Sequence, residues 1–301
     1  MKRREFIQYS SLAVGGMLLP SLISSCVPGE KKNSIGLQLY SLRDQLRREN
    51  GPDFEKSEIV KVIEAVAKAG YDKLECFGYK NESIFGIPYK EFNTVVKDLG
   101  MRITSGHYST GYNSTDKGNL RNDWERAVAD AKEVGQEYVV IPSLDEGERK
   151  TIDDYKKICE LLNKGAEVCK EYGVRMGYHN HDTEFKKLED QIPYDVMLAE
   201  LDPKLVAMEL DIYWIVYAGY NPIDYFSKYP SRFELWHVKD MEKNNRDTNA
   251  NVGTGSIDFA GLIKHAEHAG LKHYFIEQED YPVSPLESIK VSFDNFNKIL
   301  S

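Results

Sequence analysis

Cysteine is scarce in this sequence, and its spacing excludes two kinds of stabilising site. Only Cys26, Cys76, Cys159 and Cys169 occur among the 301 residues, and no two of them form a CxxC pair. Structural zinc sites and thiol redox centres usually depend on such close pairs. If Cys26 is used in the N-terminal segment, as argued below, an odd number remains. We therefore expect neither a disulfide framework nor a cysteine-based metal site.

Positive charge is also in short supply. The chain has 39 Lys and Arg residues against 48 Asp and Glu residues, a formal net charge of −9 at pH 7. Proteins that bind nucleic acids owe much of their affinity to clustered Lys and Arg. The charge balance therefore argues against a nucleic-acid partner and favours a small, neutral or weakly polar ligand.

No apolar run is long enough to span a bilayer, but the first 30 residues have the pattern of an export signal. Lys2-Arg-Arg-Glu-Phe-Ile7 is typical of a twin-arginine start, and an apolar stretch follows from Leu12 to Ile23. Ile23-Ser-Ser-Cys26 is typical of a lipoprotein processing box. The alternative is an ordinary N-terminal helix. We expect an exported bacterial protein, periplasmic or anchored through a lipid on Cys26, with residues 31–301 as its mature domain.

The rest of the chain repeats one unit without repeating its sequence: a short apolar run, a loop, and an amphipathic stretch that closes on Gly. The apolar runs begin near Ile35, Tyr71, Met101, Glu137, Val174, Val206, Phe233 and His273. Their spacing of about 30 to 40 residues is the size of a strand and its crossover helix. The eight units predict a single α/β domain, a closed (β/α)₈ TIM barrel, because closure leaves no edge strand. An open doubly wound sheet is the alternative, but no Gly-rich phosphate loop follows the first run.

Four of these runs end in residues that commonly bind metal ions. Alternate residues of a strand share a face, so the side chains pair up at the strand ends. The pairs are His179 with His181, Glu209 with Asp211, His237 with Lys239, and Glu277 with Glu279. In a barrel these ends meet at one mouth, which predicts a small space rich in imidazole and carboxylate. Such nitrogen and oxygen ligands suit Mn²⁺, Zn²⁺, Co²⁺ or Fe²⁺, with open positions for substrate oxygens.

Each of these residues also has a plainer interpretation. A single His at a strand end is more often a hydrogen-bonded structural residue than a ligand. Asp211 could cap the following helix, and Glu277 with Glu279 could form a solvated acidic end. The agreement of four strand ends in one barrel favours a metal site. Aromatic residues near strand ends could stack on a sugar or belong to the core; these are Tyr40, Phe77, Tyr108, Tyr178, Tyr213 and Trp214.

Two polar stretches, at residues 109–119 and 241–254, follow the third and the seventh predicted strands. Loops after barrel strands lie at the functional mouth, so we expect both stretches to cover the site. Mobile surface is the alternative for each.

The motifs at the strand ends resemble those of the xylose-isomerase-like barrel superfamily of sugar isomerases and epimerases. Its members include tagatose 3-epimerases, inosose dehydratases, 3-dehydroshikimate dehydratases and endonuclease IV. The resemblance covers nearly the whole mature chain, and its motifs are Ile35–Arg43, Leu210–Asp211, His237–Asp240 followed by Val252–Phe259, and Phe275–Gln278. Such a resemblance implies a fold and a site, but not one activity.

The resemblance implies one divalent metal ion and its ligands. Asp211, His237 and Glu277 match the family's Asp, His and last Glu. The fourth ligand is a Glu at the end of the fifth strand in the epimerases, and His179 stands there in this chain, as in the inosose dehydratase branch. His181 is then a substrate contact or an alternative ligand. Because relatives are often dimers or tetramers, the resemblance also allows a homo-oligomer.

The family's chemistry implies removal of a proton next to the carbonyl of a keto-sugar or keto-polyol, through a metal-stabilised enediolate. The candidate catalytic residues are Glu277 as base, Glu184 or Glu209 in place of a second glutamate, and His181, Lys239 or His107 as acid. The candidate substrate-binding residues are Glu75, His107, Glu209, Tyr213, Trp214 and Glu279.

Other activities remain open within this residue set. Isomerisation and β-elimination fit it as well as epimerisation does, so a 3-keto-glycoside lyase, a hydratase or a dehydratase is an alternative. A saccharide-binding lipoprotein without turnover is an alternative of another class, because the fifth-strand Glu is replaced. An abasic-site endonuclease is disfavoured by the acidic charge and the export signal.

Overall fold

The computed structural model describes residues 33–47, 54–109 and 123–301. The export signal predicted at residues 1–30 lies outside these ranges, as do all but Ser109 of the polar stretch 109–119. The compact unit runs from Asn33 to Ser301. Within the described ranges, no helix has the length and apolar character needed to cross a bilayer.

Eight parallel strands form the wall of a barrel, as the sequence predicts. They are β1 (Gly36–Gln38), β2 (Lys73–Cys76), β5 (Arg102–Gly106), β6 (Tyr138–Ile141), β7 (Arg175–His179), β8 (Val206–Asp211), β9 (Leu235–Val238) and β12 (His273–Ile276). Their order in the sheet is β5-β2-β1-β12-β9-β8-β7-β6. A parallel bridge between His107 and Val140 joins the two outer strands and closes the barrel. The predicted (β/α)₈ fold is therefore confirmed.

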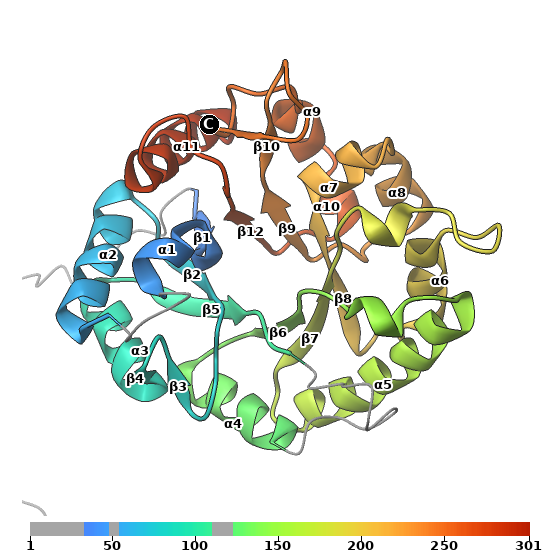
Figure 1. The fold of residues 1–301 in the computed structure, drawn as a ribbon, viewed down its shortest axis with the longest axis horizontal. Coiled ribbons are helices and arrows are strands. Elements are labelled where there is room, and N and C mark those ends of the chain that lie inside the picture. Colours follow the sequence, from blue (N-terminus) through green and yellow to red (C-terminus); the bar gives the residue numbers. More distant parts are fainter. Residues whose placement is uncertain (1–32, 48–53, 110–122) are drawn as a thin grey trace, which may run out of the picture. The chain divides into compact units, whose positions relative to one another are not determined.

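Helices surround the strands (Figure 1). The longer ones are α2 (Lys56–Ala69), α3 (Tyr89–Asp98), α4 (Trp124–Val134), α5 (Ile152–Glu171), α6 (Pro193–Glu200), α8 (Pro222–Lys228) and α11 (Pro285–Ile299). The shorter ones are η1 (Leu39–Leu42), α1 (Arg43–Leu46), η2 (Glu146–Glu148), η3 (Thr183–Phe185), α7 (Ile212–Tyr217), α9 (Phe259–Ile263) and α10 (Ala266–Ala269). In α2, Ile59, Ile63 and Val66 are buried at helical spacing, and Gly70 ends the helix at φ 112°.

The strands are buried on both faces, which is the property of a parallel sheet covered by helices. Every residue of β1, β2, β6, β8 and β9 is buried. Close packing explains Gly36, because a Cβ atom at that position would lie 2.3 Å from Cδ1 of Phe275 in the neighbouring strand. The barrel is thus a packed core that holds its strand ends in fixed register.

Two hairpins extend beyond the barrel wall. One follows β2 and consists of β3 (Ser83–Ile84) and β4 (Ile87–Pro88); the other follows β9 and consists of β10 (Asp240–Met241) and β11 (Asn249–Ala250). The second lies in the polar stretch 241–254. The Asp240 carboxylate accepts hydrogen bonds from the backbone N–H groups of Gly253, Gly255 and Ile257. These bonds restrain the chain around the end of the stretch.

Candidate metal centre

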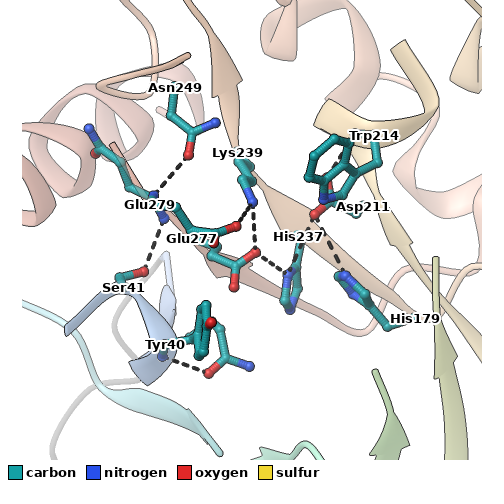
Figure 2. A network of polar contacts seen from close by, with 12 residues as sticks. Tyr40, Ser41, His179, Asp211, Trp214, His237, Lys239, Asn249, Glu277 and Glu279 are labelled. Carbon is teal, nitrogen blue, oxygen red and sulfur yellow. Dashed lines mark hydrogen bonds and ion pairs between the residues drawn. The ribbon is translucent and has the colours of Figure 1, made fainter. Parts of the chain in front are cut away.

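Four adjacent strands bring the predicted ligands together. In the sheet, β12, β9, β8 and β7 are neighbours, and Asp211 lies in register with His237. Figure 2 shows His179, Asp211, His237 and Glu277 converging from these strands. The site therefore depends on strand register, which the buried barrel residues determine.

Asp211 has one carboxylate oxygen that meets no hydrogen-bond donor. Its Oδ1 accepts a hydrogen bond from the backbone N–H of Trp214 at 3.1 Å and so caps α7. Its Oδ2 is buried and has no hydrogen-bond partner among the described residues. Nε2 of His179 lies 3.8 Å from this oxygen, and Nδ1 of His237 lies 3.9 Å from it. These separations leave space for an ion between the three atoms.

The donor set fits a divalent metal ion. Ligand atoms of Asp211, His237 and Glu277 all lie within 4.8 Å of one another, and Nδ1 of His237 is 3.1 Å from Oε2 of Glu277. Nitrogen and oxygen atoms that share an ion at bond lengths of 2.0–2.2 Å lie about 3 to 4 Å apart. Nε2 of His179 faces the same Asp211 oxygen from 3.8 Å. Among the described residues, the groups of ligand atoms close enough to share an ion include His179 but not His181, whose ring lies 5.0 Å from that of His179 and 5.6 Å from that of Trp214.

A second layer of polar side chains lies behind the histidines. Oε2 of Glu209 is 3.1 Å from Nδ1 of His179 and 3.0 Å from Nε2 of His107. Oε1 of Glu75 is 2.6 Å from Nε2 of His237 and 3.2 Å from Nε2 of His107. His107, His179, Glu209 and His237 also offer ligand atoms within 4.8 Å of one another. The centre is thus a connected layer of imidazole and carboxylate.

Lys239 supplies the fixed positive charge of the centre. Its ammonium group is buried, pairs with Glu279, and lies 3.5 Å from Oε2 of Glu277 (Figure 2). It also lies 5.2 Å from the ring centroid of Trp214. Burial alone would lower the pKa of a lysine. The Glu277 and Asp211 carboxylates outweigh this effect and hold the pKa of Lys239 well above its usual value.

Burial and charge move the pKa values of the other groups in opposite directions. Burial raises the pKa of Asp211 to about 7, helped by Glu277 and opposed by Lys239. Burial also acts to raise that of Glu277, but Lys239 and His237 outweigh it and hold the pKa of Glu277 well below its usual range. Burial, followed by Lys239, lowers the pKa of His181 to about 4. His181 is therefore neutral at physiological pH.

A cavity of about 460 Å³ opens over the centre. It is lined by Tyr40, Phe77, Gly78, Tyr79, His107, Ser109, Pro142, Ser143, His179, His181, Trp214, Glu277 and Glu279. Of the predicted substrate-binding residues, His107, Trp214 and Glu279 line this cavity. Glu75 and Glu209 do not, because both are fully buried behind the histidines.

Two further predicted residues point away from the cavity. Glu184 is buried, and its carboxylate accepts hydrogen bonds from the backbone N–H of His181 at 2.8 Å and from the hydroxyl of Tyr178 at 3.1 Å. The hydroxyl of Tyr213 donates to the backbone carbonyl of Arg246 at 2.7 Å. Glu184 thus holds the turn that presents His181, and Tyr213 anchors the β10–β11 hairpin.

Several residues of this site were not predicted from the sequence. Tyr79, Pro142 and Ser143 line the cavity from the loops after β2 and β6, where nothing in the sequence pattern distinguishes them from ordinary loop residues. Asn249 accepts the backbone N–H of Glu279 at 2.8 Å through its side-chain oxygen (Figure 2). Its position in the polar stretch after the seventh strand was the available signal.

Known proteins with similar sequences share the predicted barrel fold. Residues 63–298 match a family model described as xylose isomerase-like TIM barrel. An inosose dehydratase from Clostridium perfringens (strain ATCC 13124) is 27% identical over an alignment of 154 positions, which covers 45% of this chain and 51% of that protein. The chain spans about half the length, or less, of the curated relatives of this name that it matches.

Solved structures share the fold over most of the chain. A sugar phosphate isomerase/epimerase from Parabacteroides distasonis ATCC 8503 is 28% identical, with a TM-score of 0.74 over 88% of this chain and 98% of that one. A protein named IolI, solved with a bound zinc atom, has a TM-score of 0.69 over 89% of this chain and 98% of that one. At 14% identity, the second likeness shows the fold alone.

Proposed function

Because the chain belongs to the xylose isomerase-like TIM barrel family, we propose that it is a divalent-metal-dependent enzyme acting on a keto-sugar or keto-polyol. The reaction is removal of a proton from the carbon next to the carbonyl, through an enediolate. The observation that carries this proposal is the convergence of His179 Nε2 and His237 Nδ1 on the unpartnered Oδ2 of Asp211, beside a cavity. The names of its relatives, inosose dehydratase and sugar phosphate isomerase/epimerase, support the substrate class.

His179, Asp211, His237 and Glu277 would hold the ion. When bound, a divalent ion supplies Lewis acidity that favours negative charge on substrate oxygens. A donor set of imidazole and carboxylate suits Mn²⁺, Zn²⁺, Co²⁺ and Fe²⁺ alike, so the ligands leave the metal open.

His181 is the proton acceptor that we favour. It lines the cavity, and its ring nitrogens make no hydrogen bond within the described part of the chain, so a lone pair is open to a bound substrate. A neutral imidazole with a free lone pair can take a proton from a bound substrate. Glu277 is a weaker base, because Lys239 and His237 stabilise its charged form.

The same groups serve isomerisation, epimerisation or elimination. Elimination needs an acid for the departing oxygen, and His107 lines the same cavity as His181. Two-base epimerases place a glutamate on each face of the substrate. The cavity does not offer this arrangement, because Glu209 is buried behind the histidines. A dehydratase or a 3-keto-glycoside lyase is therefore the alternative activity that this observation favours.

Solvent isotope exchange tests the proposal. The purified protein is stripped of metal, reloaded with Mn²⁺, Co²⁺ or Zn²⁺, and incubated in D₂O with keto-sugars, keto-polyols and 3-keto-glycosides. We expect deuterium next to the carbonyl of a substrate or product, lost on metal removal and in His181→Asn. Saccharide binding without deuterium incorporation under any metal would instead indicate a saccharide-binding lipoprotein.

A further inference from the structure

We propose that Glu75 and Glu209 are positioning residues that decide which nitrogen of each metal-facing histidine is free to bind the ion. The inference rests on the metal site of the proposed function. Both carboxylates are 0% exposed and lie behind the histidines, so neither reaches the cavity. They act on the ion only through His179 and His237.

The two histidines present opposite nitrogens to Asp211. His237 directs Nε2 to Glu75 at 2.6 Å, and its Nδ1 faces two predicted ligands, Glu277 at 3.1 Å and Asp211 at 3.9 Å. His179 directs Nδ1 to Glu209 at 3.1 Å and faces Asp211 with Nε2. A neutral imidazole has one N–H, and an ionised carboxylate only accepts. Because the 2.6 Å contact with Glu75 is shorter than the 3.1 Å contact with Glu277, Glu75 selects the Nε2–H form of His237. Glu209 selects the Nδ1–H form of His179, so the remaining lone pair of His179 faces Asp211 and that of His237 faces Asp211 and Glu277.

His107 links the two carboxylates into one unit. Its Nε2 lies 3.0 Å from Oε2 of Glu209 and 3.2 Å from Oε1 of Glu75. The side-chain amide of Gln38 donates a hydrogen bond of 2.9 Å to the same Glu75 oxygen. These contacts restrain the carboxylates in a buried layer, and the carboxylates in turn orient the imidazoles. Hydrogen-bond partners of metal ligands typically contribute about 10- to 100-fold to metal affinity.

A rival arrangement would place a second ion among His107, His179, Glu209 and His237. In that case Nε2 of His179 would carry the proton. The Asp211 oxygen that it faces is 3.8 Å away, beyond hydrogen-bond reach, and no other acceptor bonds this nitrogen in the described part of the chain. The 3.1 Å separation between His179 and Glu209 has the length of a hydrogen bond. The distances therefore favour a proton on the Glu209 side and an ion on the Asp211 side.

Metal affinity measures the effect without relying on turnover. Zn²⁺ affinity is determined by competition with a chelator for the unaltered protein, Glu75→Ala, Glu209→Ala and Glu209→Gln. We expect both Ala variants to bind about 10- to 100-fold more weakly. Glu209→Gln should recover part of the loss, because its amide oxygen still accepts from His179. Asp130→Ala is the matched control: Asp130 is a buried carboxylate paired with Tyr79 and Arg126, and its loss should change the affinity by less than about threefold.

The protonated nitrogens can be observed directly in the unaltered, Zn²⁺-loaded protein by ¹⁵N NMR of the imidazoles, so the test does not depend on the variants folding. We expect Nδ1–H for His179, Nε2–H for His237 and one ion per chain. Failure of the unaltered protein to bind any ion would overturn the proposed function, and this inference with it. Three results would overturn only this inference: protonation of the opposite ring nitrogens, binding of two ions per chain, or an unchanged metal affinity in both Ala variants.

Discussion

Asp211 serves the structure with one oxygen and the candidate metal site with the other. Its Oδ1 caps α7, and its Oδ2 faces His179 and His237. The cap holds the carboxylate in one orientation, so the second oxygen needs no further restraint to face the ion. Capping and metal binding, which the sequence analysis treated as alternatives, are therefore compatible at this residue.

At the same scale, His179 and His181 should separate metal binding from catalysis. His179→Ala removes a ligand, and we expect metal affinity to fall by more than about 100-fold, beyond the range typical of indirect partners. His181→Ala should bind metal within about threefold of the unaltered protein but lose activity, because it removes the proton acceptor. Chelator competition and a turnover assay measure the two effects. The exposed His268→Ala is the control, and equal loss of affinity in all three would contradict the assignment.

The raised pKa of Asp211 gives metal binding a defined pH dependence. In the metal-free protein this group keeps its proton up to about pH 7, whereas in the unfolded chain it loses the proton near its usual value. Its contribution to stability is present at low pH and is lost as pH rises through 7, because the ionised carboxylate is buried and lies near the charge of Glu277. An ion supplies the missing charge.

We therefore expect saturating Zn²⁺ or Mn²⁺ to raise the melting temperature more at about pH 8 than at about pH 6. Differential scanning fluorimetry at fixed free metal concentration checks this. Asp211→Asn is the control, since it has no proton to lose, and its metal-dependent shift should be small at both values. An equal shift at both pH values in the unaltered protein would show that Asp211 is ionised throughout.

At the scale of elements, the β10–β11 hairpin and the segment that follows it depend on one carboxylate. Asp240 accepts hydrogen bonds of 2.9–3.1 Å from the backbone N–H groups of Gly253, Gly255 and Ile257. The hairpin in turn holds Glu279 through the side chain of Asn249. The polar composition of residues 241–254 predicted a functional loop, and the structure shows an ordered one that positions a cavity residue.

Removal of this carboxylate should loosen the loop more than the barrel. For Asp240→Ala we expect the free energy of unfolding to fall by about 2–4 kcal/mol, because several partly buried backbone donors lose a charged acceptor. Hydrogen exchange should accelerate between Met241 and Ile257 and change little in β7 and β8. Urea denaturation and exchange mass spectrometry measure the two effects. Lys243→Ala, at an exposed residue of the same loop, is the control. If it changed the unfolding free energy and the exchange rates as much as Asp240→Ala does, the role of Asp240 would be contradicted.

At the scale of the whole molecule, barrel closure gathers residues that are far apart along the chain. Glu75 and His237 are separated by 162 positions in the sequence and meet at 2.6 Å. Each polar side chain sits at the end of a buried strand, so the helices that cover the barrel also stabilise the site. The loss of one ligand should therefore change chemistry more than fold.

The N-terminal segment carries a prediction about where this barrel works. If Cys26 is lipidated, the protein expressed in a bacterial host should fractionate with membranes and gain the mass of a lipid anchor on a new N-terminus. Cys26→Ser should abolish both, and replacement of the twin arginines should hold the chain in the cytoplasm. Membrane fractionation with mass spectrometry of the purified protein is the measurement. An unprocessed N-terminus in the unaltered protein would contradict the predicted signal.

The barrel and the candidate residues at its mouth could be predicted from the sequence, because both predictions follow from local periodicity. A strand needs only its own apolar residues to be recognised, and alternation places His179 beside His181 and Glu209 beside Asp211. All eight strands lie where the apolar runs predict them. The family resemblance added the ligand set, and the geometry is consistent with it.

The depth of each side chain and the atoms that it faces could be read only from the folded chain. Glu75 and Glu209, expected to contact substrate, are behind the histidines, and Glu184 is held by His181 and Tyr178. Alternation along a strand shows which residues lie on the same face. The depth of each side chain in the barrel depends on strand tilt and on the residues of neighbouring strands. Hydrogen-bond partners such as Glu75 and His237 are 162 positions apart in the sequence, so no local pattern encodes them.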